Sequence, residues 1–345
     1  MTGDVLSVGI AGCGWAGRRH GDVLADRDDA TIAAVAEPAA EPRRECATAW
    51  GVPATFDGYG KMLGEADLDA VVIALPHHLH EDAAVTAAHH GIDVLVEKPI
   101  ARTLAEADRM LDAAADAGIR IVVAESARYE PWTAAVDRHL AEGAIGTPLF
   151  ATMNRLADYG GSYGYDRSEW LNDPERLGGG PWLLNGIHTV SVVRSWFEAP
   201  ESGRPVRVTA TDARTTDFDA PAGMEGSVAA TIAYESGASA RVVIGVETPH
   251  CDRFNDVRIH GTEGTIVVPQ DRHELAIHRP DEPTTTETVA DESPFPRQLG
   301  TFLAHVRDGT PTRSDGRRER NSLAVVRAGY RSIESGEAVR PDLRK

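Results

Sequence analysis

The stretch VLSVGIAGCGWAG, residues 5–17, decides the fold of the first part of the chain. An aliphatic run leads into Gly12, Gly14 and Gly17, spaced as Gly-x-Gly-x-x-Gly, and a helix-like pattern follows. In such a turn the first glycine permits a tight bend, the second lets the backbone approach a pyrophosphate, and the third lets helix and strand pack closely. The helix amino terminus adds N–H donors and partial positive charge. The stretch therefore predicts a dinucleotide-binding turn.

An acidic residue lies where the adenosine ribose of such a dinucleotide is expected. A second aliphatic run, residues 31–36, ends at Glu37, which is 20 residues after Gly17. A carboxylate at this distance accepts a hydrogen bond from the ribose 2′-hydroxyl and repels a 2′-phosphate. Arg43 and Arg44 are not far along the chain, but no cation is adjacent to Glu37. We therefore expect NAD(H) rather than NADP(H).

Strand-like and helix-like segments alternate over the first 125 residues. The strand-like runs are residues 5–11, 31–36, 70–74, 93–97 and 120–124. The helix-like patterns between them are residues 15–25, 41–50, 81–90 and 104–117. Continuous aliphatic runs are typical of parallel strands buried on both faces. The alternation predicts a doubly wound Rossmann domain of the α/β class over residues 1–125.

The pattern changes after about residue 125. Segments of alternating polarity, which are typical of an antiparallel sheet, lie at residues 148–155, 206–215, 227–234, 238–247, 256–260 and 265–268. One long helix is predicted over residues 181–197, and two more follow residue 294, separated by the polar stretch 308–315. Residues 281–293, charged and rich in threonine, predict a surface loop. We assign residues 126–345 to a second α/β domain with a large, mainly antiparallel open sheet.

Composition limits the partners of the chain. Its 345 residues include 35 Lys and Arg against 53 Asp and Glu, a formal charge of −18. Such an acidic surface repels nucleic-acid phosphates and anionic lipid, so we expect neither as a partner. No apolar run reaches membrane-spanning length, and no export signal is evident. Cys13, Cys46 and Cys251 form no CxxC pair, which favours reduced thiols and a cytoplasmic protein.

Two further motifs are more specific than the glycine turn. Residues 70–80 read AVVIALPHHLH and residues 94–99 read VLVEKP. With the glycine turn, they closely resemble the glucose–fructose oxidoreductase/inositol dehydrogenase (Gfo/Idh/MocA) family, whose strands end in Pro-x-x-x-His and then in Glu-Lys-Pro. Further matches occur, in order, at residues 128–131 (RYEP), 143–148 (GAIGTP), 178–180 (GGG), 186–188 (GIH) and 260–265 (HGTEGT).

The resemblance implies a function as well as a fold. It implies oxidation or reduction, with NAD, at a carbinol carbon of a sugar, cyclitol or related polyol, and an open sheet that forms a homodimer or homotetramer contact. Two alternatives stay open. One is an enzyme that holds NAD tightly and performs net hydrolysis or epimerisation without net redox change. The other is a nucleotide-sensing regulator without enzymatic activity.

Lys98 is the first candidate catalytic residue. It follows a strand end, where ligands bind in doubly wound sheets, and it should face the nicotinamide. Partial burial beside an oxidised nicotinamide disfavours its charged form, which suits it to share the proton of a reacting hydroxyl. The motif implies a cis peptide before Pro99, with Glu97 orienting the loop. The expected cofactor-binding residues are Gly12, Gly14, Trp15, Ala16, Gly17, Glu37, Leu75, Pro76, His77, His80, Glu97, Lys98 and Arg128.

His188 is the second candidate, because it matches the histidine that acts as general acid/base in the family. The sequence departs from the pattern beside it. Leu184 stands where many members have an aspartate one turn earlier, and Ser191 stands where another is often found. Asn185 is three residues before His188 and can flank the site from the same helix face. An amide cannot raise the basicity of the imidazole as a carboxylate would.

A glycine-rich loop offers substitutes for the missing carboxylate. Tyr163 and Tyr165 could close over a substrate and donate a phenolic proton, and Asp166 could supply an acid. An ordinary surface loop is the alternative for each of them. Tryptophans could stack on a sugar ring or pack in the core: Trp132, Trp170 and Trp182. The histidines after residue 76 lack ligand spacing with cysteines, and we expect no metal site.

Overall fold

The computed structural model describes residues 5–156, 169–198, 203–213, 224–246 and 255–344. The chain divides into two compact units. The first comprises Met1–Ser126 and Ser293–Arg320, and the second comprises Ala127–Glu292 and Asn321–Lys345. This division differs from a single boundary after residue 125, because a segment near the carboxyl end packs with the first unit.

The sheet of the first unit has six parallel strands in the order β3-β2-β1-β4-β5-β6. Their bounds are β1 Leu6–Ala11, β2 Ala30–Ala36, β3 Ala54–Phe56, β4 Ala70–Ile73, β5 Asp93–Glu97 and β6 Ile121–Ala124. The order reverses between β1 and β4, which is the switch point where Rossmann folds bind their ligands. The predicted doubly wound domain is confirmed. Only β3 was not predicted, because three residues are too few to show a pattern.

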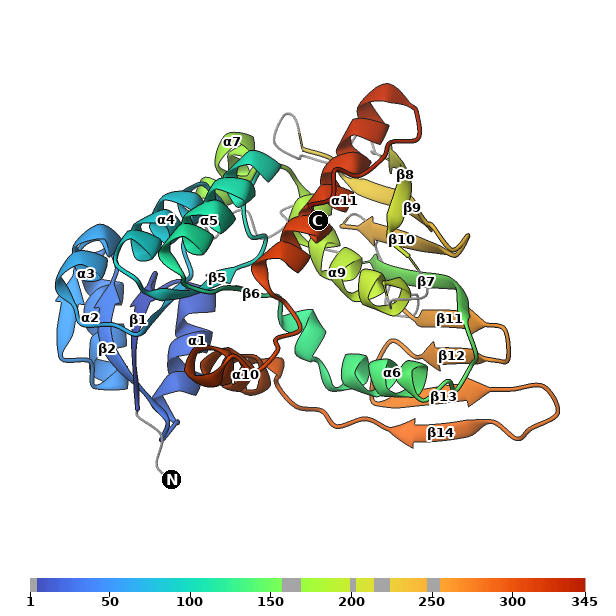
Figure 1. Cartoon of the computed structure of the whole chain (residues 1–345), viewed down its shortest axis with the longest axis horizontal. Coiled ribbons are helices and arrows are strands. Elements are labelled where there is room, and N and C mark those ends of the chain that lie inside the picture. Colours follow the sequence, from blue (N-terminus) through green and yellow to red (C-terminus); the bar gives the residue numbers. More distant parts are fainter. Residues whose placement is uncertain (1–4, 157–168, 199–202, 214–223, 247–254, 345) are drawn as a thin grey trace. The chain divides into compact units, whose positions relative to one another are not determined.

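Helices cover the sheet of the first unit (Figure 1). They are α1 Trp15–Ala25, α2 Ala40–Trp50, α3 Tyr59–Glu65, α4 His80–His89, α5 Leu104–Ala117 and α10 Pro294–Asp308, with a short 3₁₀ turn at His77–Leu79. The helix α10 joins this unit through Leu299, Phe302 and Leu303, which are buried in the same core cluster as Ile10 of β1. Burial of these three side chains, at about 1.5–3 kcal/mol each, explains why the segment belongs here.

The second unit holds an eight-stranded sheet in the order β14-β13-β12-β11-β7-β10-β9-β8. Its strands are β7 Pro148–Leu156, β8 Pro205–Ala213, β9 Ser227–Tyr234, β10 Ser239–Gly245, β11 Val257–Gly261, β12 Thr265–Val268, β13 Glu274–His278 and β14 Thr285–Thr288. Only β7 and β10 pair in parallel. The mainly antiparallel sheet was predicted, but β13 was missed and β14 lies inside the predicted loop 281–293. The four residues of β14 are mostly exposed, so they show no alternation.

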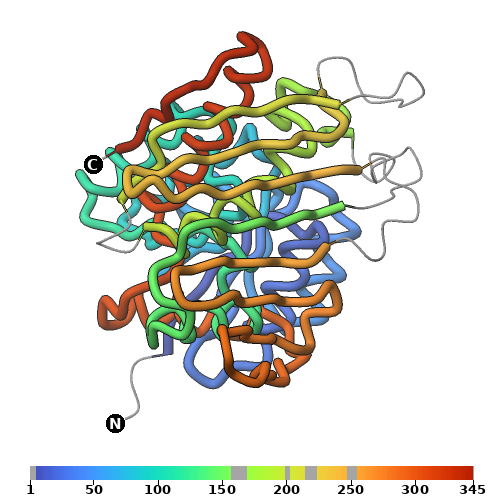
Figure 2. Tube along the Cα trace, turned by 90° about the vertical axis from the view of Figure 1, so that its right-hand side faces the viewer, coloured from blue at the N-terminus to red at the C-terminus, as the bar shows by residue number. Residues whose placement is uncertain are grey.

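Helices cover one face of this second sheet. The helices of the second unit are α6 Pro131–Ala141, α7 Pro174–Leu177, α8 Pro181–Leu184, α9 Gly186–Phe197 and the greater part of α11 Gly316–Ser335, with 3₁₀ turns at Ser126–Tyr129 and Glu169–Asn172. The helix α6 packs against β13, and α9 packs against β7 and β10. On the opposite face of the sheet, turned toward the viewer in Figure 2, no helix of the described residues lies.

The long helix predicted over residues 181–197 is interrupted. It is divided into α8 and α9 at Asn185 (φ −113°, ψ −35°), which is the C-cap residue of α8 and the N-cap residue of α9. The Trp182 indole donates from Nε1 to the Val326 carbonyl oxygen at 3.0 Å and fills the space beside Gly186. The prediction placed Asn185 inside one continuous helix. In the structure it lies instead at the junction between α8 and α9.

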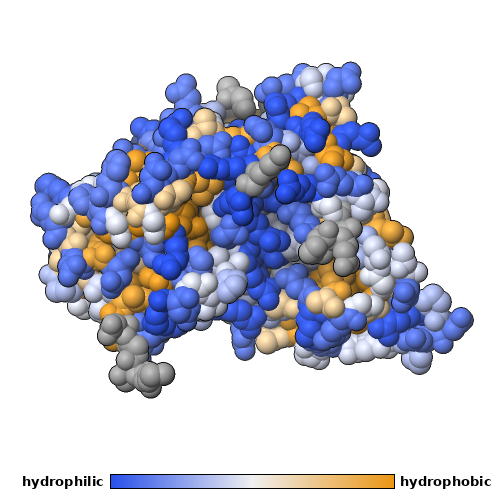
Figure 3. Space-filling model, viewed as in Figure 1, coloured by the Kyte–Doolittle hydropathy of each residue, from blue (hydrophilic) through white to orange (hydrophobic). Residues whose placement is uncertain are grey.

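The described surface is largely hydrophilic on the face drawn in Figure 3. Figure 3 shows a face covered mainly by hydrophilic residues, with apolar residues gathered in small patches. None of the described helices is both long and apolar enough to cross a membrane.

Candidate active site

The three glycines of the first turn differ in their surroundings. A Cβ at Gly12, where φ is +102°, would lie 2.2 Å from the Ala74 carbonyl oxygen. A Cβ at Gly17 would lie 1.9 Å from the Gly12 carbonyl oxygen, whereas nothing lies within 4 Å of a Cβ at Gly14. The fold itself therefore requires Gly12 and Gly17. Gly14 instead borders open space, where a pyrophosphate would approach the backbone.

The amino terminus of α1 suits an anion. No side chain caps it, and no acidic residue lies in its first turn, so its first N–H groups remain for a ligand. Trp15, the first residue of α1, is 67% exposed although it is a large aromatic side chain. Phe295 lies at its edge, with ring centroids 6.0 Å apart, and the Arg19 guanidinium lies 5.6 Å from its ring centroid. The turn thus fits the phosphates of a dinucleotide.

Glu37 is fixed at the edge of this turn. One carboxylate oxygen accepts a hydrogen bond from the Cys13 N–H (3.0 Å), and the other accepts one from the Ala39 N–H (3.0 Å). Arg43 donates to the carbonyl oxygens of Glu37 and Pro38, so its guanidinium is held by the backbone. The carboxylate keeps further lone pairs for a hydroxyl donor.

The Glu-Lys-Pro motif lies at the end of β5, and the Lys98–Pro99 peptide is cis, as the resemblance implied. The Glu97 carboxylate accepts a hydrogen bond from Nε2 of His20 (2.8 Å) and one from the backbone N–H of Lys98 (3.2 Å). Burial raises the pKa of Glu97, but the bond from His20 and the charge of Lys98 outweigh it and hold the pKa below its usual range. Glu97 therefore connects the lysine loop to α1.

His20 was not identified from the sequence. It is fully buried on α1, and the Phe295 ring packs against it with centroids 5.2 Å apart. The only signal was its position, three residues after Gly17 on the helix of the glycine turn. Nothing in the local pattern pairs it with Glu97, which is 77 residues away.

His80 has a different place from the one expected. It was predicted to line the cofactor cleft, but it is completely buried. Its Nδ1 lies 3.0 Å from the Pro99 carbonyl oxygen and its Nε2 lies 2.9 Å from the Leu75 carbonyl oxygen. Burial lowers its pKa despite these two bonds. Because both ring nitrogens face backbone oxygens, His80 joins the loops after β4 and β5. The His77 ring lies beside it, with centroids 5.5 Å apart.

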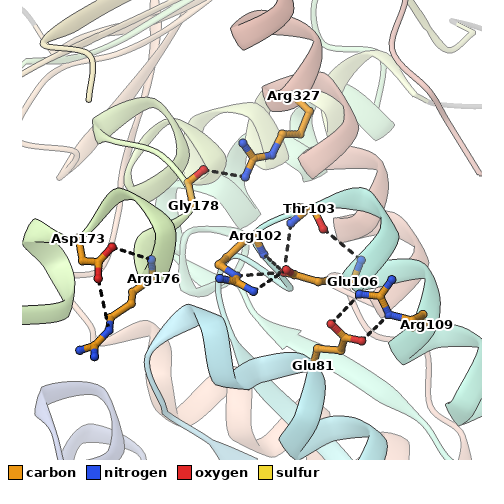
Figure 4. A network of polar contacts seen from close by, with 9 residues as sticks. All are labelled: Glu81, Arg102, Thr103, Glu106, Arg109, Asp173, Arg176, Gly178 and Arg327. Carbon is orange, nitrogen blue, oxygen red and sulfur yellow. Dashed lines mark hydrogen bonds and ion pairs between the residues drawn. The ribbon is translucent and has the colours of Figure 1, made fainter. Parts of the chain in front are cut away.

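The segment after Pro99 is anchored on α5 (Figure 4). Thr103 caps α5 by accepting from the Glu106 N–H at 3.2 Å. The Glu106 carboxylate accepts from the Arg102 backbone N–H (2.9 Å) and from its guanidinium (2.7 Å). Arg109 of α5 forms a two-bond ion pair with Glu81 of α4. The loop that carries Lys98 is thus held at both ends.

In the second unit, His188 lies on α9 and is 8% exposed. Leu184, where an aspartate was expected, packs on a buried cluster that includes Met224 and Val246. Ser191 is 1% exposed. The position of the usual aspartate is thus used for core packing. Asn185 is partly exposed and precedes α9 as its N-cap residue, so its predicted role beside His188 stays a prediction.

The sequence analysis missed Glu225, which is 3% exposed and anchors α8. Its carboxylate accepts from the Trp182 N–H (2.6 Å), the Gly180 N–H (3.2 Å) and the Tyr330 hydroxyl (2.8 Å). Burial raises its pKa. In Figure 4, the Arg327 guanidinium donates to the Gly178 carbonyl oxygen (2.8 Å) on the same glycine run.

The remaining residues named in the sequence analysis are an arginine, two tryptophans and three residues of the glycine-rich loop. Arg128, expected at the cofactor, is 4% exposed; it donates to Ser195 and pairs with Asp137 at 3.7 Å. The partners of its guanidinium named here, Ser195 and Asp137, both belong to the second unit. Trp132 and Trp182 are 2% and 0% exposed, which assigns them to the core. Three loop candidates lie outside the described residues: Tyr163, Tyr165 and Asp166.

Comparisons with known proteins agree with this architecture. Residues 6–125 match the oxidoreductase family with an NAD-binding Rossmann fold, and residues 133–267 match the GFO/IDH/MocA C-terminal domain. The chain is 30% identical over 326 residues to D-xylose 1-dehydrogenase (NADP(+)) 2 of Haloferax volcanii, covering 92% of this chain and 91% of that protein. It is 28% identical to D-apiose dehydrogenase of Paraburkholderia graminis, covering 96% and 88%.

A solved structure has the same fold. Levoglucosan dehydrogenase in complex with NADH and levoglucosan superposes with a TM-score of 0.88 at 22% identity, covering 98% of this chain and 99% of that one. The family resemblance inferred from the motifs is confirmed, and the relatives are NAD(P)-dependent dehydrogenases that act on CH–OH groups. From its glycine turn to its second sheet, the chain belongs to the Gfo/Idh/MocA family of oxidoreductases.

Proposed function

We propose that this chain is an NAD(H)-dependent oxidoreductase that transfers a hydride to or from a hydroxyl/ketone carbon of a sugar, cyclitol or sugar-like metabolite. The observation that carries the proposal is the link between the two motifs of the first unit. His20 of the glycine-turn helix binds Glu97, and Glu97 binds the backbone of Lys98. This link couples a dinucleotide turn to a lysine at a strand end. Xylose and apiose dehydrogenases among the relatives support the same class of substrate.

Glu37 supports NAD(H) as the cofactor. Its carboxylate is held by two backbone N–H groups and would repel a 2′-phosphate, while Arg43 is held by backbone carbonyls. The xylose dehydrogenase relative is named for NADP(+), so the choice differs within the family. Titration of NADH and NADPH against intrinsic fluorescence measures this preference. Tighter binding of NADPH would contradict it.

The residues have separate roles in the proposed reaction. When bound, the nicotinamide would supply the two-electron oxidant or reductant. Lys98 would hydrogen-bond the reacting oxygen, and Glu97 would hold the lysine loop in place. His188, as a neutral imidazole, would take the hydroxyl proton, and Asn185 would bind a neighbouring hydroxyl. Tyr163 remains a proposed second proton donor.

Two substitutions test these roles. Lys98→Ala and His188→Ala should each lower turnover by at least about 100-fold, because general acid–base groups contribute about 10²–10⁴-fold. NADH affinity should stay within about twofold of the wild type, since the change lies at the reacting carbon and leaves phosphate binding intact. Lys61→Ala, at an exposed pair with Asp57, and His89→Ala, at an exposed position, are the matched controls. Near-normal turnover in Lys98→Ala would remove Lys98 from the proposed mechanism, and near-normal turnover in His188→Ala would remove His188.

A further inference from the structure

Two arginines lie at one end of the eight-stranded sheet. Arg155 is at the carboxyl end of β7, and Arg272 is in the turn between β12 and β13. Pairing of β7 with β11 and of β11 with β12 brings this turn to the same end. Side chains join the strand ends there. The Leu156 N–H donates to the Asn255 side chain (2.6 Å), and the Asn255 N–H donates to the Gln270 side chain (3.3 Å).

Both arginines belong to the helix-covered face. Alternation along β7 places Arg155 on the same face as Ala151 and Met153, which are buried beneath helices. The Arg272 guanidinium lies 4.8 Å from the ring centroid of Trp132 on α6. Glu130 directly precedes α6, and its charge acts on both arginines. The three charged side chains therefore gather beside the first turn of α6.

These charges are not neutralised by direct pairing. Over the ranges that the structure describes, neither guanidinium donates a hydrogen bond or forms an ion pair, and the Glu130 carboxylate accepts none. Burial and the charge of Arg155 lower the pKa of Arg272, and burial raises the pKa of Glu130. Arg155 and Arg272 are half-buried, and a guanidinium withdrawn from water is normally paired, as the buried Arg194 is with Glu198 at 2.6 Å. An anion from outside the chain would complete this cluster.

The cluster lies at the end of the sheet where α9 begins. Arg155 pairs with Ile244 of β10. Two residues further on, Val246 belongs to the buried cluster against which Leu184 packs, just before α9. His188 on α9 and Arg155 on β7 thus share one face and one end of the sheet, because α9 packs against β7. Ligands held by His188 and by Arg155 would therefore lie over the same end of this sheet.

We propose that Arg155 and Arg272 bind a carboxylate of the substrate, so that the preferred substrates are acidic sugars such as aldonates or uronates. This inference rests on the proposed dehydrogenase function. Two arginines and Glu130 sum to one positive charge, which matches a monoanion better than a phosphate dianion; Asp291, the other acid acting on Glu130, is exposed. The planar guanidinium fork also fits a carboxylate.

The test compares acidic and neutral sugars of the same skeleton. Glucuronate, galacturonate and gluconate are compared with glucose and galactose in turnover with NAD, and their binding to the NADH-loaded protein is measured by calorimetry. We expect the acids to bind at least 10-fold more tightly. Arg155→Gln and Arg272→Gln should each weaken binding of the acids at least 10-fold and leave NADH affinity unchanged. Arg241→Gln, at an exposed position on β10, is the control.

The outcomes separate the two proposals. Turnover of glucose or galactose without binding of the acids overturns the carboxylate subsite and leaves the dehydrogenase proposal standing. Calorimetric binding of the acids that both arginine variants lose, with no redox turnover of any sugar, supports the subsite and counts against the dehydrogenase. Tighter binding of glucose 6-phosphate than of glucuronate overturns the carboxylate assignment. If Arg272→Gln does not fold, the test uses Arg155→Gln and Arg272→Lys instead. Arg272→Lys keeps a positive charge and should therefore retain part of the affinity for the acidic sugars.

Discussion

At the scale of single residues, the glycines of the first turn are of two kinds: the fold requires two of them, and only ligand binding would require the third. Gly12 and Gly17 are required because a side chain would collide with backbone oxygens of this same unit. Gly14 is required by nothing in the described chain, since its surroundings are open. Gly14 lies between Gly12 and Gly17 in the chain, and only Gly14 has space beside it. We therefore expect the pyrophosphate to approach the backbone most closely at Gly14.

This difference gives a matched pair of substitutions. Gly14→Ala should leave the melting temperature unchanged and weaken NADH binding at least about 10-fold, or about 1.4 kcal/mol, because the methyl group occupies the approach of the pyrophosphate. Gly17→Ala should instead lower the melting temperature. Gly60→Ala, also in open space, is the control. Fluorescence titration and thermal melting measure both effects, and unchanged NADH affinity in Gly14→Ala would contradict the assignment.

The buried pair of His20 and Glu97 predicts a pH dependence. Because the folded pKa of Glu97 is held below its usual value, the carboxylate stabilises the fold above about pH 4.5, and this contribution is lost as pH falls through the lower folded pKa. His20→Phe removes the main favourable bond and should raise the pKa of Glu97. Urea unfolding at pH 7 and pH 4 should therefore show a larger stability difference between wild type and variant at pH 7.

His20→Gln tests whether the pair also positions Lys98. Glutamine keeps an N–H donor toward Glu97, so it should restore part of the turnover that His20→Phe loses, with little change in KM. Equal turnover in both variants would indicate that His20 only fills space.

At the scale of elements, the short helix α8 is held from distant parts of the second unit. Glu225 accepts bonds from two of its first backbone N–H groups, and the Tyr330 hydroxyl accepts from Gly180 (3.1 Å) and Leu183 (3.2 Å). The helix that carries His188 follows directly. A four-residue helix has little stability of its own, so these contacts determine where α9 begins.

Removal of one hydroxyl tests this anchor. Tyr330→Phe removes the hydroxyl that donates to the buried Glu225 carboxylate and accepts from the Gly180 and Leu183 N–H groups, and it should cost about 1–3 kcal/mol of unfolding free energy. Tyr59→Phe removes a hydroxyl that donates to Asp82 (2.6 Å) at an exposed site and should cost less than about 1 kcal/mol. Urea denaturation compares them. A similar cost for both would argue against the anchor.

At the scale of the whole molecule, one face of the second sheet is covered by none of the helices that the structure describes (Figure 2). Partly exposed residues line it, among them Asn154 of β7, Ala229 of β9 and Val243 of β10. Small and apolar side chains on an open sheet suit contact with a second copy of the chain. We therefore propose a homodimer or homotetramer through this face.

Charge placed in this face should break the assembly. Val243→Asp puts a carboxylate at the centre of the sheet and should shift the protein to smaller species in sedimentation. Val5→Asp, at a residue that is 53% exposed in the first unit, should leave the size unchanged. A wild-type chain that sediments as a monomer would refute the proposed contact.

Much of the molecule follows from local patterns. Aliphatic runs, glycine spacing and helix periodicity were sufficient for β1, β2, β4, β5, β6 and for helices α1, α2, α4 and α5, because a strand buried on both faces, a tight turn and an amphipathic helix each leave a pattern in their own residues. The glycine spacing also identified Glu37 as a candidate, whereas Lys98 and His188 became candidates through motifs that resemble those of the family. The antiparallel sheet was found through its alternation, and the strands it missed, β13 and β14, are short and end in exposed polar residues.

The remaining features depend on residues far apart in the chain, and only the tertiary structure decided them. Packing of α10 on the first unit, the bond between His20 and Glu97, the burial of His80 between two loops and the anchoring of α8 by Glu225 all join distant segments. The two unpaired arginines are the same kind of feature, since strand pairing brings them to one end of a sheet. Turn and helix chemistry acts over a few residues, whereas burial and charge pairing act between segments that only the complete fold brings together.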